Sequence, residues 1–575
     1  MFGTKWETSK RQYGIRKEKN VSIPMSDGIT IAADVFRPDA TGKFPAILGV
    51  QPYERKLQSD PMMPQGLNMA NGGIEAGDYN FYVRRGYAHV ITSNRGTGQS
   101  GGVYDHYGPR EVQDTAEVIQ WIAAQPWCDG NVGMFGVSAF AVSQQQVAAI
   151  KPPHLKALFT PFGYTDFYRD KSYHGGILSH AFLRGWATTL DNLRCESWCL
   201  KKWGERKYGE AIREALQDDE MRAIPYLVEA LKHPQEGANP LIVDILLNRF
   251  DTEYFRERSV DYSKGAEVPA YLGGDWGMYG LHLPGASRSW RYWKGPKKLI
   301  IGPPIYLDRP VYQYAYESLR WFDHWLKGIE NGIMNEPPVR LYIMDTGEWK
   351  TSDEWPLPET RWTPFYLHER GLLSEHEFWP NEGHTTFEDS FMNRDGVTFT
   401  TPVLIENTEI IGPMVLNLYA SSTEEEILWF ISIFDIDPAG NEKLLTRGWL
   451  RGSQRELDLQ RSLPWLPCHS HTRREPLVPE KIYEFNIEIR PLAKLFPMGH
   501  HIGLRVKCAD NEKPTCFPDA AGTGHLWRQS GSRVTIYHDA DHPSRLLLPV
   551  TRGNVIGTYM SGGKTSTEFF PYRKY

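Results

Sequence analysis

The sequence predicts an α/β sheet domain that is interrupted by a helical insertion and followed by an all-β domain. Three observations predict this architecture. Strand-like and helix-like segments alternate over the first 165 residues, strand signals stop between about residues 166 and 265, and short strands separated by turn residues recur from about residue 340. With 575 residues, 41% of them hydrophobic and 23% charged, the chain is long enough for two or three packed domains.

The first domain is expected to contain a mostly parallel sheet. Apolar runs bounded by turn residues predict its strands, and a segment with apolar residues at helical spacing lies between two of them. Strands that alternate with crossover helices usually pair in parallel. The expected strands are 29–36, 44–51, 86–93, 132–136 and 155–160, and the expected helix is 111–124.

A helical cap over the carboxyl edge of the sheet is expected at residues 166–265. This stretch lacks strand signals and carries the polar–apolar periodicity of helices. Two short apolar strands, 268–273 and 298–302, then return the chain to the sheet domain. A helix at 317–327 follows them and stops at Gly328.

The last part of the chain is predicted to be a β-sandwich of the jelly-roll type. Its expected strands are 339–344, 414–420, 428–434, 483–489 and 532–537. The predicted domain limits are therefore 1–165 and 266–338 for the sheet domain, 166–265 for the cap, and 339–575 for the jelly roll.

Ser138 stands at a sharp turn between an apolar strand and a helix. Such a nucleophile elbow lifts the hydroxyl above the sheet, and the N-terminal end of the following helix favours a developing anion. The usual motif is Gly-x-Ser-x-Gly, and here Phe140 occupies the last glycine position. Ser100 also lies in a Gly-x-Ser-x-Gly match, but that match does not lead directly from a strand into a helix. Ser138 is therefore the expected nucleophile.

Charge and composition narrow the function classes. The net charge of −6 and the absence of a basic stripe argue against a nucleic-acid partner. We recognise no secretory signal or membrane span and expect a cytoplasmic protein with no membrane partner. No metal and no cofactor are expected, because Cys195 and Cys199 lack a second ligand pair nearby and the glycine-rich stretch 96–102 lacks the lysine of a P-loop.

Several motifs along the chain together resemble a known family, the cocaine esterase/NonD hydrolases, which are related to the Xaa-Pro dipeptidyl peptidases and the α-amino-acid ester hydrolases. The matching stretches run nearly from end to end: Met25-Ser-Asp-Gly28, Ala33–Pro38, Gln51-Pro-Tyr53, Arg95–Gly101, Trp121–Trp127, the elbow, Asp166–Asp170, Thr446–Arg451 and His538–Pro549. The resemblance implies an α/β-hydrolase domain, a helical cap and a C-terminal jelly roll. It also makes a homo-oligomer plausible.

The resemblance implies ester or amide cleavage through an acyl-serine on Ser138. Tyr53 falls on the tyrosine whose hydroxyl helps to form the oxyanion hole, and the backbone N–H of Ala139 would be the second donor. Two such donors aimed at a developing oxyanion are often the largest catalytic contribution.

The expected triad partners depart from the family pattern. Met278 or Gly277 falls at the acid position, and Asp275 stands two or three residues earlier. Tyr306 stands where the histidine is expected, and an ordinary tyrosine with a pKa near ~10 is a poor base at neutral pH. His282, in the same loop as Asp275, is the best replacement base. Tyr306 is left as a hydrogen-bond donor to substrate, a weak acid/base or a space-filling side chain.

The leading interpretation is a serine hydrolase acting on a small organic ester or amide. Tyr173, His174 and Trp276 are the expected walls of the substrate pocket, and the 13% aromatic content suits an apolar pocket for a small molecule. Because the usual histidine is replaced, two alternatives stay open. One is a non-hydrolytic enzyme that catalyses C–C cleavage, proton transfer or cyclisation in the same pocket, and the other is a pseudohydrolase.

Overall fold

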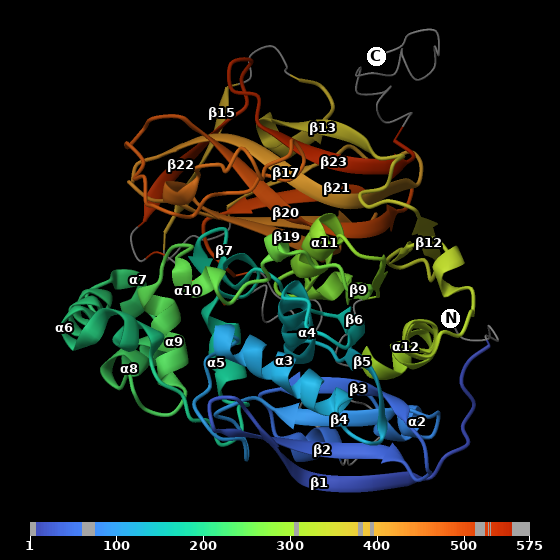
Figure 1. Ribbon diagram of the computed structural model, residues 1–575. Coiled ribbons are helices and arrows are strands. Elements are labelled where there is room, and N and C mark those ends of the chain that lie inside the picture. The colour runs from blue at the N-terminus through green and yellow to red at the C-terminus, as the bar shows by residue number, and fades with distance from the viewer. Residues whose placement is uncertain are drawn as a thin grey trace.

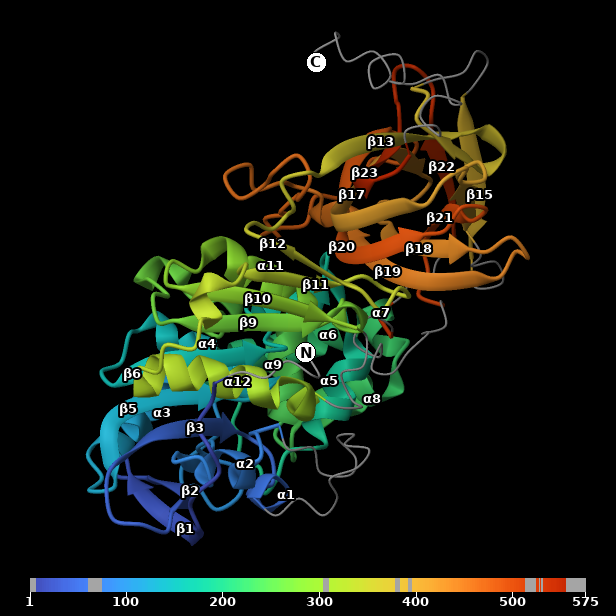
Figure 2. The ribbon, with the colours of Figure 1, turned by 90° about the vertical axis from the view of Figure 1, so that its right-hand side faces the viewer.

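The computed structural model of the chain describes residues 7–59, 75–303, 310–377, 383–390, 396–511, 524–526, 528 and 531–554. The first domain is built on one ten-stranded sheet with the order β1-β2-β4-β3-β5-β6-β9-β10-β11-β12 (Figures 1 and 2). Neighbouring strands from β4 to β11 all pair in parallel. The strands are β1 Ile15–Pro24, β2 Thr30–Pro38, β3 Phe44–Gln51, β4 Ala88–Ser93, β5 Cys128–Phe135, β6 Leu155–Pro161, β9 Ala270–Asp275, β10 Lys297–Gly302, β11 Val339–Tyr342 and β12 Trp349–Ser352.

Helices pack on the central strands of this sheet and bury them, as parallel sheets require. The helices are α1 Arg55–Ser59, α2 Tyr79–Val83, α3 Pro109–Ala123, α4 Ala139–Ala149, α11 Leu283–Tyr292 and α12 Pro310–Lys327. Strand β3 is buried over almost its whole length, and its limits coincide with the predicted strand 44–51.

One predicted domain limit is wrong. We expected the sheet domain to end at residue 338, but β11 pairs in parallel with β10, and β12 pairs antiparallel with β11. The apolar–polar alternation that begins at Val339 is typical of a sandwich strand, yet here it describes a strand at the edge of the first sheet. Both strands therefore extend the first domain past residue 350.

Six helices form the cap, which lies beside the sheet domain (Figure 1). They are α5 His180–Ala187, α6 Trp198–Ala215, α7 Asp219–Arg222, α8 Pro225–Lys232, α9 Asn239–Leu247 and α10 Glu253–Arg256. A π-helical turn, η2 (Phe167–Ser172), and a small hairpin of β7 (Tyr173–His174) and β8 (Ile177–Leu178) precede them. The sequence predicts only helices in this stretch. The strands of the hairpin were not predicted because two residues are too short to carry a periodic signal.

The C-terminal domain consists of one strongly curved sheet of eleven strands, in the order β15-β22-β17-β20-β19-β18-β21-β16-β14-β13-β23. An additional pairing of β17 with β23 brings its far end back, so the fold class expected for the chain is confirmed. The strands are β13 Arg361–His368, β14 Leu372–Ser374, β15 His384–Asp389, β16 Val397–Thr400, β17 Thr408–Ser422, β18 Leu428–Ile436, β19 Glu442–Arg451, β20 Tyr483–Phe496, β21 His501–Lys507, β22 Ser532–Tyr537 and β23 Arg545–Arg552.

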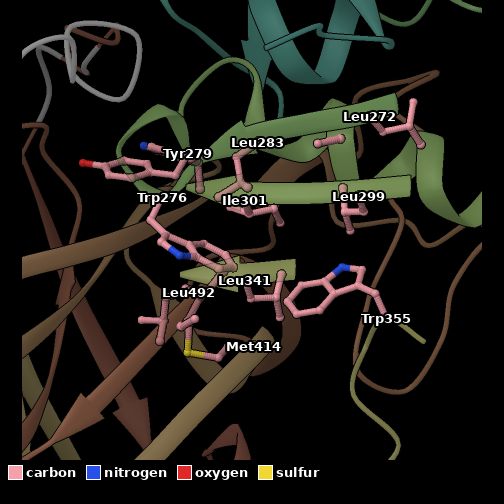
Figure 3. Packing of buried hydrophobic residues seen from close by; sticks show 14 of the residues in the cluster. Leu272, Trp276, Tyr279, Leu283, Leu299, Ile301, Leu341, Trp355, Met414 and Leu492 are labelled. Atoms are coloured by element: carbon pink, nitrogen blue, oxygen red, sulfur yellow. The ribbon is translucent and has the colours of Figure 1, made fainter. Parts of the chain in front are cut away.

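A continuous apolar core joins the two domains (Figure 3). Trp276, from the turn after β9, lies in this core with Trp355 and with Met414 and Leu492 of the jelly roll. The Trp276 indole N–H donates to the backbone oxygen of Tyr342 at 2.6 Å. The jelly roll therefore packs directly on the end of the sheet that carries β9 to β12.

None of the helices in the described part of the chain combines the length and the apolar character that crossing a membrane requires.

Candidate active site

Ser138 occupies a sharp turn between β5 and α4. Its backbone has φ 57° and ψ −118°, a conformation that side chains other than glycine adopt only at an energetic cost. The side chain keeps 9% of its surface exposed, although nearly every neighbour on α4 is buried. The strained turn therefore presents the hydroxyl to a small accessible space at the N-terminal end of a helix.

Phe140 replaces the usual last glycine of the elbow without disturbing the turn. Its fully buried ring packs on two glycines of the sheet domain, Gly49 of β3 and Gly136 at the end of β5. A Cβ added to Gly136 would lie 2.3 Å from the Cβ of Phe140, and Gly136 has φ 145°. The usual motif has a small glycine at position 140. Here the bulky Phe140 fits because the neighbouring positions 49 and 136 are glycines, which have no side chain.

The imidazole of His282 lies within hydrogen-bond reach of the Ser138 hydroxyl. Its Nε2 lies 3.3 Å from the Oγ of Ser138. Complete burial lowers the pKa of the imidazole from its ordinary value near 6.5 to about 3, so the ring is neutral at neutral pH. A neutral ring can accept the serine proton on Nε2.

A short turn after β9 positions His282. Oδ1 of Asp275, the last residue of β9, accepts a hydrogen bond from Met278 N at 2.9 Å and caps the 3-10 turn η4 (Trp276–Met278). The oxygen of Met278 then accepts a hydrogen bond from His282 N at 3.0 Å. Asp275 and His282 therefore belong to one hydrogen-bonded turn at the carboxyl end of β9.

Tyr53 follows β3, and its hydroxyl group lies beside the nucleophile. The Ser138 side chain is close enough to affect the pKa of this phenol, and the phenol oxygen accepts a hydrogen bond from the indole N–H of Trp186 at 3.0 Å. Burial and the nearby Glu75 raise the pKa of Tyr53 far above its ordinary value, so the phenol keeps its proton. A protonated phenol can donate to an oxyanion.

Trp186 was not predicted as a site residue, although it completes this group. It lies on α5 of the cap and keeps 7% of its surface exposed. A tyrosine hydroxyl has one hydrogen, so accepting from Trp186 leaves that hydrogen available for another acceptor. No sequence motif marks Trp186, because its contact with Tyr53 depends on how the cap folds back over the sheet.

The three predicted pocket residues have different surroundings. Trp276 lies in the interdomain core, and not in the apolar cluster that contains Tyr53 and Trp186. The His174 ring is fully buried and bonds to His525 Nε2 at 2.8 Å and to the Asp170 oxygen at 3.1 Å. The hydroxyl of Tyr173 donates to the oxygen of Ile245. His174 thus connects the cap hairpin to the jelly-roll side of the molecule.

Three further candidates differ in what the structure shows of them. Tyr306 lies outside the described residues. Ser100 is held by two hydrogen bonds of 2.9 Å, one from Ala32 N and one to the oxygen of Ser93, which suits a structural role for its hydroxyl. Ala139 is the first residue of α4, where backbone N–H groups have no intrahelical acceptor.

Two family profiles match this chain. The X-Pro dipeptidyl-peptidase (S15 family) profile matches residues 27–305, and the X-Pro dipeptidyl-peptidase C-terminal non-catalytic domain profile matches residues 331–547. Between them they span both domains described above.

Curated and solved relatives agree with these matches. The cocaine esterase of Rhodococcus sp. (strain MB1 Bresler) is 25% identical over 592 residues, which cover 93% of this chain and 98% of that protein. The crystal structure of a CocE/NonD family hydrolase from Staphylococcus aureus is also 25% identical, covers 93% of both chains and has a TM-score of 0.76. An α-amino-acid ester hydrolase structure shares the fold, with 18% identity, coverage of 96% of this chain and 99% of that chain, and a TM-score of 0.73.

The sheet order, the elbow at Ser138 and the two matched profiles lead to one conclusion: the chain belongs to the α/β-hydrolase family of the cocaine esterase/NonD hydrolases and X-Pro dipeptidyl peptidases.

Proposed function

We propose that the chain is a serine hydrolase that cleaves an ester or amide of a small organic molecule through an acyl-serine on Ser138. The observation that carries the proposal is the 3.3 Å approach of His282 Nε2 to Ser138 Oγ at a strained elbow. A serine hydroxyl hardly ionises by itself, and a base in hydrogen-bond reach is what activates it. Relatives named as esterases support the same reaction class.

The proposed first half-reaction forms the acyl-enzyme. Ser138 Oγ attacks the carbonyl carbon while its proton passes to His282 Nε2. The developing oxyanion accepts hydrogen bonds from the Tyr53 hydroxyl and from the backbone N–H of Ala139. The tetrahedral intermediate collapses, the bond to the leaving alcohol or amine breaks, and His282 returns the proton to that leaving group.

In the second half-reaction, water replaces the serine. His282 takes a proton from a water molecule, whose oxygen attacks the acyl carbon, and the proton then returns to Ser138 as the carboxylic acid leaves. Asp275 is the proposed acid that orients the imidazole and stabilises its cationic form, because it belongs to the same turn as His282.

The non-hydrolytic and pseudohydrolase alternatives depended on the missing histidine. His282 supplies a base from another position of the same sheet edge, and this favours hydrolysis over both alternatives. In this proposal Tyr306 can still be a hydrogen-bond donor to substrate, a weak acid/base or a space-filling side chain.

A fluorophosphonate probe tests the nucleophile directly. The wild-type protein is expected to be labelled at neutral pH, and Ser138→Ala and His282→Ala are expected to lose labelling. Ser143→Ala is the matched control, because Ser143 lies on the same helix and donates only to the Ala139 oxygen. A folded wild-type protein that stays unlabelled and cleaves no 4-nitrophenyl ester would contradict the proposal.

A further inference from the structure

Lys171 is a buried amine beside the active site that the proposed mechanism does not use. It lies on η2 and only 1% of its surface is exposed. Its Nζ lies 2.8 Å from His106 Nε2, and no carboxylate of the described residues lies within ion-pair distance of it. Burial lowers the pKa of this lysine well below its ordinary value. A lysine is almost never fully buried without an ion-pair partner, so the position of this amine calls for an explanation.

Four aromatic rings surround the Lys171 amine. Nζ lies 3.8 Å from the ring centre of Trp186, 4.6 Å from that of Phe167, 5.5 Å from that of Tyr164 and 5.6 Å from that of Tyr107. The faces of such rings carry negative quadrupole charge and attract a cation. They stabilise a protonated amine, but they do not replace a counter-ion.

The same rings connect Lys171 to both sides of the catalytic group. The Trp186 indole donates to Tyr53 on the oxyanion side. The Tyr164 ring is nearly parallel to the His282 ring, with centres 6.5 Å apart, on the side of the base. The amine is therefore separated by one ring from the oxyanion donor and by one ring from the base.

His106 is fixed in a position that keeps the amine in place. Its backbone has φ 52° and the next residue, Tyr107, has φ 65°, so two consecutive side chains other than glycine adopt the left-handed region. The other ring nitrogen of His106, Nδ1, lies 3.3 Å from the Tyr254 hydroxyl. Backbone strain of this kind persists only where surrounding contacts impose it.

We propose that Lys171 selects substrates that carry a carboxylate close to the scissile carbonyl, so that the substrate anion pairs with the Lys171 amine inside the aromatic cage. The substrate would supply the negative charge that the protein omits, and a substrate with an ammonium group in the same place would be excluded. This inference rests on the proposed hydrolysis at Ser138 and adds the charge of the substrate to it. A charge-assisted hydrogen bond in a desolvated site supplies that preference.

A matched pair of chromogenic esters tests the selection. Mono-4-nitrophenyl glutarate and 4-nitrophenyl pentanoate have acyl chains of equal length and differ by the terminal carboxylate. The wild-type ratio of kcat/KM for the anionic over the neutral ester is expected to exceed that of Lys171→Met at least about tenfold. Lys171→Arg is expected to retain part of the preference, and Lys207→Met, which removes an exposed lysine from α6, is expected to retain all of it. Equal ratios in wild type and a folded Lys171→Met protein overturn the inference.

Equilibrium binding separates this inference from the proposed hydrolysis. Calorimetry on Ser138→Ala is expected to show tighter binding of monomethyl glutarate than of dimethyl glutarate, and Ser138→Ala/Lys171→Met is expected to lose the difference. If this holds while the wild type cleaves neither ester, the anion site stands and the hydrolytic proposal fails. If Lys171→Met does not fold, the Ser138→Ala comparison decides alone, and equal affinity for the two glutarate esters contradicts the anion site.

Discussion

The indole N–H of Trp186 and the hydroxyl oxygen of Tyr53 are 3.0 Å apart, so a residue of the cap orients a phenol that belongs to the sheet domain. The phenol is close enough to Ser138 for the serine side chain to affect its pKa. Part of the proposed oxyanion hole therefore depends on a contact between the cap and the sheet domain. Four predictions follow from this contact and from the elbow and turn that accompany it.

Trp186→Phe is expected to lower kcat roughly three- to tenfold with a smaller change in KM, because a single neutral hydrogen bond orients the Tyr53 hydroxyl and the ring itself is retained. In a Tyr53→Phe background the same change is expected to have no further effect on kcat, which distinguishes orientation from general packing. Steady-state kinetics on 4-nitrophenyl esters measures both. Trp203→Phe on α6 is the control, and an unchanged kcat in Trp186→Phe would refute the role.

Asp275→Asn is expected to lower kcat at least about a hundredfold and to leave the melting temperature nearly unchanged. The amide oxygen can still accept from Met278 N, so the turn stays capped, while the negative charge that the proposal uses to orient the imidazole is lost. Asp275→Ala should lose stability as well, since it removes the cap. Thermal unfolding and kinetics on both variants separate the two effects, and full activity in Asp275→Asn would exclude the acid role.

The activity is expected to persist well below pH 6. Because burial lowers the pKa of His282 from 6.5 to about 3, the free enzyme keeps a neutral base as the pH falls through 5, and the acidic limb of kcat/KM should lie far below that of an ordinary histidine. Below pH 6.5 the unfolded chain binds a proton that the native site rejects, so this histidine also makes stability decrease with falling pH. A pH–rate profile, accompanied by circular dichroism at each pH, tests this, and a limb at 6–7 would contradict it.

Gly136→Ala is expected to lower the free energy of unfolding by about 1–3 kcal/mol, since it adds a methyl group against Phe140 at a positive φ. Phe140→Gly, which restores the usual motif, should cost about 3–5 kcal/mol because it empties a buried ring site. The double variant should lose less than the sum, as the collision is then removed. Urea unfolding of the three proteins measures the coupling, and strict additivity would mean that the two positions do not compensate each other.

The strands of the first sheet could be predicted where apolar runs end at turn residues. Strand β3 matches its prediction because the run from Phe44 to Gln51 is buried along its length. The edge strand β1 was missed, since Ile15–Pro24 is mostly exposed or half-buried and has no clean alternation. The limit at residue 338 was misplaced because alternation predicts a strand without naming its partner strand.

The residues of the candidate site also differ in how far they could be proposed from the sequence. Ser138 and Tyr53 could be proposed because each lies in a short motif whose local geometry is set by its neighbours. His282 could be proposed from its loop, but its 3.3 Å contact with Ser138 depends on the turn that Asp275 caps. Trp186 and Lys171 carry no such local signal, since they reach the site only through the folding of the cap and η2. Trp276 was expected to line the pocket, and the structure places it in the interdomain core instead.

The continuity between Asp275 and Trp276 makes the jelly roll a structural support for the chemistry. Asp275 caps the catalytic turn, and the next side chain is anchored in the core shared with β20 and bonded to Tyr342. Loosening of the jelly roll is therefore expected to displace the backbone that carries Asp275 and His282, and inactivation on heating should coincide with separation of the two domains. A truncated protein that contains the hydrolase domain alone would lack the packing that supports the turn at Asp275.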